Sequence, residues 1–451
     1  MRPLPSLLLL LLGSLAGSVA AQEAPFPESV GTSAAELTPG EAVRLGLEHN
    51  RRIQAARADA EGARAAAREV QADRRPAIRL RGDVRHLVGA IPEAEFTLPG
   101  VDTTFSILPI PRDQVHSEIS IEQPLFQGMR LRNRALAAEH QADAATARVE
   151  QEEAEVALAV RMAWWNLYRA MAVRDATEAA LARAEAHARD VDNLFQEGVV
   201  LRADLLAART RRSQVGLDAL EASNAVRVAR LELNRLIGRP LESELRPAPA
   251  EVPASVEGEL EELTERALAD RPGLLALARE VRALEREVGI TRGTWLPEIS
   301  LVGRYVYARP NPLVFADLDR FRGIGEAGVV LRWSLFEGGR RVAGTARAQA
   351  RLTAAEERLA DAREGVTVEV ARRYLEAVQA EELLEAAARH REEAEETHRV
   401  VQSQFAEGVV LPAQVLEAEQ VRRGAESREA EARAEHAIRQ AALLAALGRV
   451  W

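Results

Sequence analysis

The side chains that could carry chemistry are few and scattered in this 451-residue chain. It contains no cysteine, which excludes disulfides, thiolate metal sites and cysteine nucleophiles. The eight histidines form no ligand motif, and His390 and His398 lie two helical turns apart, beyond shared metal ligation. No Gly-x-Ser-x-Gly motif or glycine-rich phosphate loop stands at a strand-to-helix turn. We therefore expect no enzyme, no metal site and no cofactor.

Composition favours long helices. Nine Phe, four Tyr and five Trp are too few to anchor several compact cores in a chain of this length. Much of the 47% hydrophobic content is alanine, a strong helix former that suits helices packed closely side by side. The net charge of −10 gives no basic surface, so we expect no nucleic-acid partner.

The first 21 residues have the pattern of an export signal. Arg2 is followed by an apolar run over residues 7–12 and by small residues up to Ala21. We expect cleavage after Ala21, with Ala20 as the alternative. The run is too short for a membrane anchor, and no other stretch reaches the ~20 apolar residues of a spanning helix. A mature chain that crosses a bilayer must then do so as a barrel.

The rest of the chain contains two copies of one unit. Pro-Leu-Phe-Gln-Gly-Met-Arg at residues 124–130 resembles Ser-Leu-Phe-Glu-Gly-Gly-Arg at residues 334–340, an offset of 210. Phe-Gln-Glu-Gly-Val-Val-Leu at residues 195–201 resembles Phe-Ala-Glu-Gly-Val-Val-Leu at residues 405–411, again at 210. Upstream, residues 75–80 match residues 296–301 at an offset of 221, so the first copy has the longer loop between its strands.

Each copy contains a long segment with coiled-coil spacing. Small apolar residues recur three and four apart at Leu131, Ala135, Ala138, Ala142, Ala145 and Val149, and at Thr345, Ala348, Leu352, Ala355, Leu359, Ala362 and Val366. Such spacing predicts paired helices whose backbones approach closely. No proline interrupts residues 129–197 or 339–407, so each helix would be ~100 Å long at 1.5 Å per residue.

Four runs alternate apolar and polar residues, as β-strands do. Ile78, Leu80 and Val84 begin the set, and similar runs contain Ile119 and Ile121, Leu301 and Tyr305, and Val329 and Leu331. Alternation alone fits both membrane hairpins and hairpins on a soluble core. The export signal favours the membrane. Four strands cannot close a barrel. Closure needs at least ~8 strands, so two copies would be the minimum and three would supply 12.

These patterns define the expected organisation. A signal peptide covers residues 1–21. The first repeat covers 22–238, with a helix, a β-hairpin at 76–126, a long helix at 129–197 and a helix at 202–237. A linker or equatorial strap covers 239–259, and residues 22–38 are expected to be weakly ordered. The second repeat covers 260–451, with a helix, a β-hairpin at 297–336, a long helix at 339–407 and a helix at 412–447. The expected fold class is mainly α with a membrane β-barrel portion.

The repeat, the two Leu-Phe-(Gln/Glu)-Gly motifs and the two Gly-Val-Val-Leu turns resemble the TolC-like outer membrane efflux proteins over nearly all of the mature chain. The resemblance implies a homotrimer in the outer membrane, with one 12-stranded barrel and an α-helical tunnel in the periplasm. It also implies two partners, a periplasmic adaptor protein and an inner-membrane pump that supplies the energy.

The resemblance places adaptor docking and a periplasmic entrance at the two helical turns. In this chain those turns are Gly198, Val199, Val200 and Leu201, and Gly408, Val409, Val410 and Leu411. The alternative is that they are ordinary helix caps with buried valines. An arginine that helps to lock the entrance in some members is replaced here by Val200 and Val410.

Some members carry acidic rings six and nine residues after the second turn glycine. Gln414 and Glu417 occupy these positions, so only Glu417 fits, and Asp204 could compensate for Gln414. Three symmetric carboxylates would attract cations. The alternative is a solvated helix face.

Together these features predict an outer membrane exit duct of a tripartite efflux or type I secretion system, a passive conduit for substrates delivered by the pump through the adaptor. The alternative is an exported periplasmic coiled-coil scaffold or adaptor-like protein. The sequence does not identify the cargo, which within the family includes drugs, metal ions and polypeptides.

Overall fold

The structure, a computed structural model, describes residues 35–89, 95–97, 104–106, 111–248, 253–314, 320–407, 409–410 and 412–448. The expected signal peptide at residues 1–21 lies outside the described residues. So do two of the candidate turn residues, Gly408 and Leu411.

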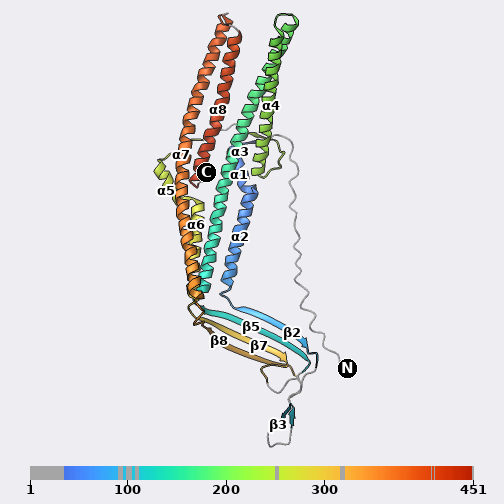
Figure 1. The fold of residues 1–451 in the computed structure, drawn as a ribbon, viewed down its shortest axis with the longest axis vertical. Helices are drawn as coiled ribbons and strands as arrows, with labels where there is room; N and C mark the ends of the chain where they lie inside the picture. The colour runs from blue at the N-terminus through green and yellow to red at the C-terminus, as the bar shows by residue number, and fades with distance from the viewer. Residues whose placement is uncertain are drawn as a thin grey trace.

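Helices dominate the chain (Figure 1). Their bounds are α1 (Pro39–His49), α2 (Arg51–Ala72), α3 (Arg130–Gln196), α4 (Arg202–Leu236), α5 (Leu260–Asp270), α6 (Pro272–Gly293), α7 (Arg340–Ala406) and α8 (Pro412–Ala446). The helices α3 and α7 have 67 residues each, and each pairs with a following helix of 35 residues, α4 or α8. The heptad-like segments therefore form two long antiparallel hairpins.

The duplication is preserved helix by helix. A shift of 210 residues converts the bounds of α3 and α4 into those of α7 and α8. A shift of 221 converts α1 and α2 into α5 and α6. Both helical halves of the repeat thus have the same lengths in the two copies, which confirms the tandem-repeat protomer.

Each copy begins with two helices where one helix was expected. Asn50 interrupts the first pair, because its side-chain oxygen caps Arg52 N–H at 2.9 Å and its amide donates to the Leu236 carbonyl at 2.8 Å. In the second copy Arg271 is extended before Pro272, which occupies the first turn of α6.

The strands form one four-stranded sheet at the end of the molecule opposite the hairpin turns (Figure 1). Its order is β2 (Ala77–His86), β5 (Asp113–Gln127), β7 (Glu298–Arg309) and β8 (Arg322–Arg332), and every neighbouring pair is antiparallel. The register shifts between Pro124 and Phe126, where proline cannot donate a ladder hydrogen bond. Within this sheet β2 and β8 are the edges.

Two small sheets were not foreseen in the sequence. The strand β1 (Ala35–Leu37) pairs in parallel with β6 (Leu245–Pro247) in the strap, and β3 (Glu95–Thr97) pairs with β4 (Thr104–Ser106). The expectation of weak order up to residue 38 is therefore wrong for residues 35–38. Leu37 is buried, and its carbonyl accepts a hydrogen bond from the Trp164 indole at 2.7 Å.

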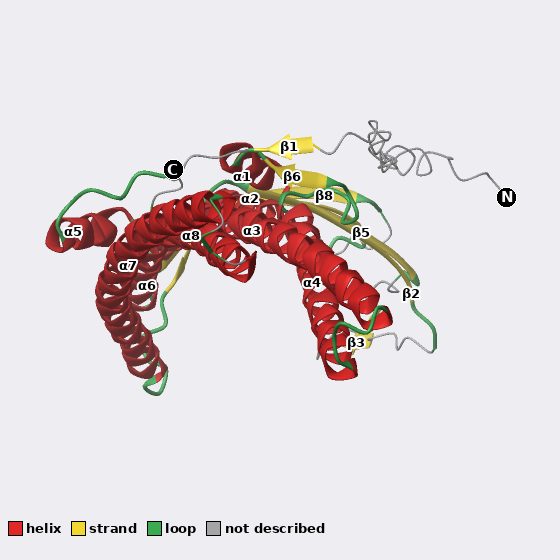
Figure 2. Cartoon of the chain, turned by 90° about the horizontal axis from the view of Figure 1, so that it is seen from above, coloured by secondary structure: helices red, strands yellow, loops and turns green. Residues whose placement is uncertain are grey.

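The largest core lies halfway along the first hairpin, where α3, α4, α1 and β1 meet α8. Trp164 is fully buried there and stacks on Tyr168, with ring centroids 5.9 Å apart. Seen along the long axis, the helices form a curved wall and not a closed bundle (Figure 2). A mainly helical chain with a four-stranded sheet confirms the expected fold class.

Candidate functional site

The two helical turns that the sequence singled out lie at the same end of the molecule (Figure 1). We call residues 197–201, between α3 and α4, the first tip, and residues 407–411, between α7 and α8, the second tip. They lie at the end of the molecule farthest from the sheet, so the long helices separate the tips from the strands.

The first tip closes α3 with a left-handed glycine. Gly198 has φ +77°, which few other residues adopt without strain. Val199 N–H donates to the Leu194 carbonyl at 2.9 Å, as in a Schellman motif. Leu201 then begins α4 in an extended conformation. The second tip repeats this bond, from Val409 N–H to the Gln404 carbonyl at 2.9 Å.

Both tips expose one valine and partly bury the next. Val199 is 67% exposed and Val409 is 69% exposed. Val200 packs against a small cluster of Ala188, Val191, Leu205 and Ala208, which holds the first turn together. A cap alone needs no exposed valine, whereas Val199 and Val409 each add an exposed apolar side chain at the matching position of the two tips.

The three candidate entrance residues divide between the tips. Asp204 caps α4, because its carboxylate accepts the Leu201 N–H at 3.0 Å. Gln414, the repeat counterpart of Asp204, and Glu417 are exposed one turn apart on α8. A single chain brings none of these groups into a ring.

Carboxylates near Glu417 are held in ion pairs, and Glu417 is not. The hydrogen bond from Arg423, at 3.0 Å, lowers the pKa of Glu419, and Arg183 of α3 adds to this effect. Among the described residues Glu417 has no hydrogen bond or ion pair. Its carboxylate is therefore exposed to solvent and is not neutralised by a neighbouring arginine among the described residues.

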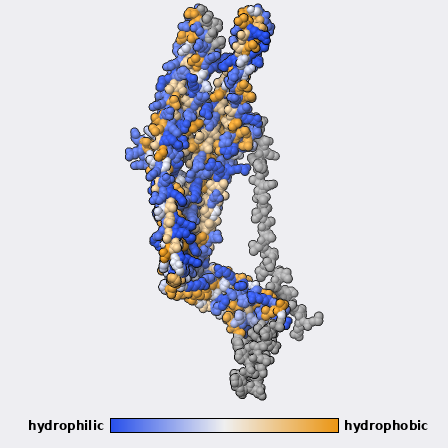
Figure 3. Space-filling view, in the orientation of Figure 1, coloured by the Kyte–Doolittle hydropathy of each residue, from blue (hydrophilic) through white to orange (hydrophobic). Residues whose placement is uncertain are grey.

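The four-stranded sheet has two chemically different faces. One face carries exposed apolar side chains that lie opposite each other in register: Ile78 with Ile121, Leu80 with Ile119, Ile119 with Tyr305, and Leu301 with Val329. No described segment of the chain covers this face, and Figure 3 shows apolar residues gathered on the sheet.

The opposite face carries charges that pair across strands. Arg79 contacts Glu122 at 3.4 Å, and Arg304 contacts Glu326 at 2.6 Å and Glu118 at 3.8 Å. Such groups favour contact with water over contact with hydrocarbon. The predicted alternation along the strands therefore corresponds to one apolar and one charged surface.

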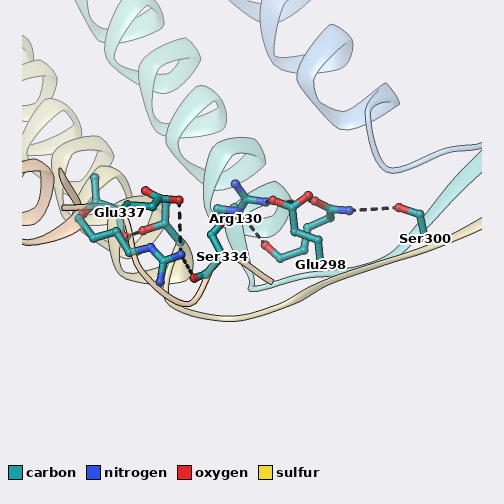
Figure 4. A network of polar contacts seen from close by, with 9 residues as sticks. Arg130, Glu298, Ser300, Ser334 and Glu337 are labelled. Atoms are coloured by element: carbon teal, nitrogen blue, oxygen red, sulfur yellow. Dashed lines mark hydrogen bonds and ion pairs between the residues drawn. The ribbon is translucent and has the colours of Figure 1, made fainter. Parts of the chain in front are cut away.

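A polar network at the junction of sheet and helices escaped the sequence analysis (Figure 4). Arg130 binds Glu298 and the side chain of Gln127, and Gln127 in turn donates to Ser300 at 3.3 Å. In the second copy, Arg341 binds the Ser334 carbonyl and Glu337, and lies over the Trp295 ring at 5.3 Å. The repeated Leu-Phe-(Gln/Glu)-Gly motif was the only signal for this network.

Comparison with known proteins decides the family. The family profile described as outer membrane efflux protein matches residues 42–239 and 263–449. The chain belongs to the outer membrane efflux protein family. No curated protein matches it by sequence. Among the described residues, no group of His, Asp or Glu could hold a metal ion, and no helix is long and apolar enough to cross a membrane.

Solved outer membrane channels share the fold of this efflux protein. The Campylobacter jejuni CmeC channel has a TM-score of 0.73 at 15% identity, covering 94% of this chain and 90% of its own. The open state of the Neisseria gonorrhoeae MtrE channel has a TM-score of 0.69 at 19% identity, covering 93% of each chain. Vibrio cholerae VceC has a TM-score of 0.69 at 18% identity, covering 91% of this chain and 96% of its own.

Membership assigns an efflux channel role and an outer membrane location, with the helical part in the periplasm. The family consists of channel proteins and not of enzymes. The recognition made from the repeat and its turns is thereby confirmed.

Proposed function

We propose that the protein is the exit duct of a tripartite efflux or type I secretion system. In this proposal three copies form the duct, and substrates pass through it passively after an inner-membrane pump delivers them through a periplasmic adaptor. The observation that carries the proposal is the sheet, which has an exposed apolar face, a charged face and two free edges.

The sheet can enter a membrane only as part of a larger barrel. Free edges leave backbone groups unpaired, which is not tolerated in hydrocarbon. Three copies supply 12 strands, enough for a closed barrel. The apolar face then meets lipid, and the charged face lines a water-filled lumen that continues between the curved helical walls.

The tips face the periplasm in this arrangement and are our candidates for adaptor docking. The support is the exposed valine that both tips present from the same turn geometry. Glu417 would form a ring of three carboxylates inside the entrance. A soluble periplasmic scaffold is disfavoured, because it would leave the apolar sheet face in water.

The test is to express the full chain and locate it. We expect the protein in outer membrane fractions, with the mass of a trimer after extraction in mild detergent and with ion conductance in planar bilayers. A soluble monomer would contradict the proposal and support the scaffold alternative.

A further inference from the structure

A cavity rich in arginine lies at the junction of sheet and helices, beside the polar network of Figure 4. Its volume is ≈ 330 Å³. The start of β7, the end of β8, the end of α6 and the first turns of α3 and α7 form its wall. The charged residues of this wall are Arg130, Arg332, Arg340, Arg341, Glu298 and Glu337. We call this cavity the arginine pocket.

The arginine pocket keeps positive charge that the chain does not neutralise. Each of its two glutamates is already held in an ion pair, Arg130 with Glu298 and Arg341 with Glu337. The side chains of Arg332 and Arg340 form neither an ion pair nor a hydrogen bond within the described part of the chain. Two of the four arginines are therefore free to bind an anion from solution.

Arg341 adds a buried donor to the pocket. Its side chain is only 7% exposed, because the guanidinium donates to the Ser334 carbonyl and lies 5.3 Å from the centre of the Trp295 ring. Its Nε is buried and has no hydrogen-bond partner among the residues that the structure describes. A buried donor without a partner is costly, so an acceptor oxygen in the pocket would stabilise this arrangement.

The two repeats differ at the positions that make the pocket cationic and open. At the offset of 210 residues, the replacements from the first repeat to the second are Glu122 by Arg332, Leu131 by Arg341 and Arg134 by Gly344. A Cβ on Gly344 would meet nothing within 4 Å, so close packing does not require a glycine there. Glycine also weakens a helix. Its effect here is to leave the wall of the pocket open.

We propose that the arginine pocket binds an oxyanion, a phosphate or carboxylate group, of a soluble molecule. The planar guanidinium presents N–H donors in the geometry that both groups accept. The strand residues of the pocket, Glu298 and Arg332, lie opposite each other and share the charged face with Arg304 and Glu326. A phospholipid headgroup has the same chemistry, but lipid would contact the apolar face.

The inference rests on the proposed function for the source of the anion. In the exit duct the charged face lines the lumen, so anionic cargo would pass the pocket on its way out. The binding itself depends only on the arginines and can be measured on the purified protein.

The test is the binding of inorganic phosphate to the full-length protein in detergent. Isothermal titration calorimetry at low ionic strength, where screening is weak, should show saturable binding. Arg332→Gln and Arg340→Gln should each weaken the affinity about tenfold or more, because each removes a charge-assisted contact. Arg351→Gln is the matched control and should bind as the wild type does. Arg351 is an exposed arginine of α7 without an ion pair among the described residues, on the same helix face as Arg340 and three turns further along.

A second variant tests the space in the pocket without removing a charge. Gly344→Leu should weaken phosphate binding about tenfold or more, because the leucine side chain would occupy the opening. It should not lower the temperature of thermal unfolding, since leucine is a better helix former than glycine and its Cβ meets no neighbour. The absence of saturable binding, or equal binding in the wild type and all three pocket variants, would overturn the inference.

Phospholipid content separates the two sources of the anion. We expect equal phosphorus per chain in the purified wild type and in the double variant Arg332→Gln/Arg340→Gln. A phospholipid retained by the wild type and lost from the double variant would assign the pocket to a headgroup and contradict a soluble ligand.

The outcomes also separate the pocket from the proposed function. An outer membrane trimer that binds no phosphate would overturn the pocket and leave the exit duct standing. A soluble monomer that binds phosphate through these arginines would support the pocket and overturn the exit duct.

Discussion

At the scale of single residues, an exposed carboxylate without a partner and a buried histidine have unusual surroundings. Glu417 is exposed and unpaired among the described residues, whereas Glu419, two residues later, is held by Arg423 and Arg183. His436 is a buried polar residue against the strap, next to Gln440, whose side chain accepts the Val256 N–H at 3.0 Å. Each leads to a prediction.

Replacing Glu417 with Gln should reduce the cation preference of the channel, because three carboxylates would no longer attract cations at the entrance. The measurement is the reversal potential of planar bilayers in a salt gradient. Gln414→Glu should increase the preference, since it adds a second ring one turn away. An unchanged reversal potential in both variants would contradict an entrance role for α8.

Acid should loosen the strap at His436. Burial lowers the pKa of His436, and the opposing effect of Glu381 is smaller. A lowered pKa in the folded state means that the folded protein binds this proton less readily than the unfolded chain. The contribution of neutral His436 to the free energy of unfolding is therefore complete above the ordinary histidine pKa of about 6.5. It decreases as the pH drops below that value. Thermal unfolding at pH 7.5 and 5.5 should show this loss, and His436→Gln should lose less between the two values. An equal loss in both proteins would exclude His436 as the cause.

At the scale of elements, the repeat provides matched positions with different neighbours. Gly128 and Gly338 share nearly the same φ, +58° and +57°, at the start of the two long helices. A Cβ on Gly128 would lie 2.3 Å from the Gly293 carbonyl oxygen, whereas nothing lies within 4 Å of a Cβ on Gly338.

Alanine at these two glycines should therefore destabilise the protein unequally. Both substitutions strain a left-handed residue by ~1–2 kcal/mol. Only Gly128→Ala also forces α3 and α6 apart, which should cost a further ~1–3 kcal/mol. Chemical unfolding in detergent measures the difference, and equal losses would show that α3 and α6 do not approach as closely as described.

Elements with a sequence period were predictable, and elements fixed by distant contacts were not. The recurrence of small residues from Leu131 onward and the alternation around Ile119 correspond to a 67-residue helix and a 15-residue strand. The three-residue strand β1 has no period of its own and depends on β6 and on the Trp164 indole. The break at Asn50 likewise depends on the Leu236 carbonyl, 186 residues away.

The candidate functional site likewise has one part that the sequence indicated and one part that depends on distant contacts. The tips could be singled out because the sequence Gly-Val-Val-Leu occurs twice, at residues 198–201 and 408–411. The ion pair of Arg130 with Glu298 joins residues 168 positions apart, and the repeated Leu-Phe-(Gln/Glu)-Gly motif beside Arg130 does not identify Glu298 as its partner.

At the scale of the whole molecule, a single chain is an incomplete structure. Its described residues form a curved wall and a sheet. The edge strands β2 and β8 of this sheet pair with no further described strand, and no other described segment covers its apolar face.

The most direct test is the labelling of single cysteines along β8 in the membrane-inserted trimer with a water-soluble maleimide. The series covers four consecutive positions, Val329, Val330, Leu331 and Arg332, each changed to cysteine in turn. We predict strict alternation, with labelling at positions 330 and 332, which share the charged face, and protection by lipid at 329 and 331. Equal labelling at all four positions would contradict a sheet with one face toward lipid and the other toward a water-filled lumen.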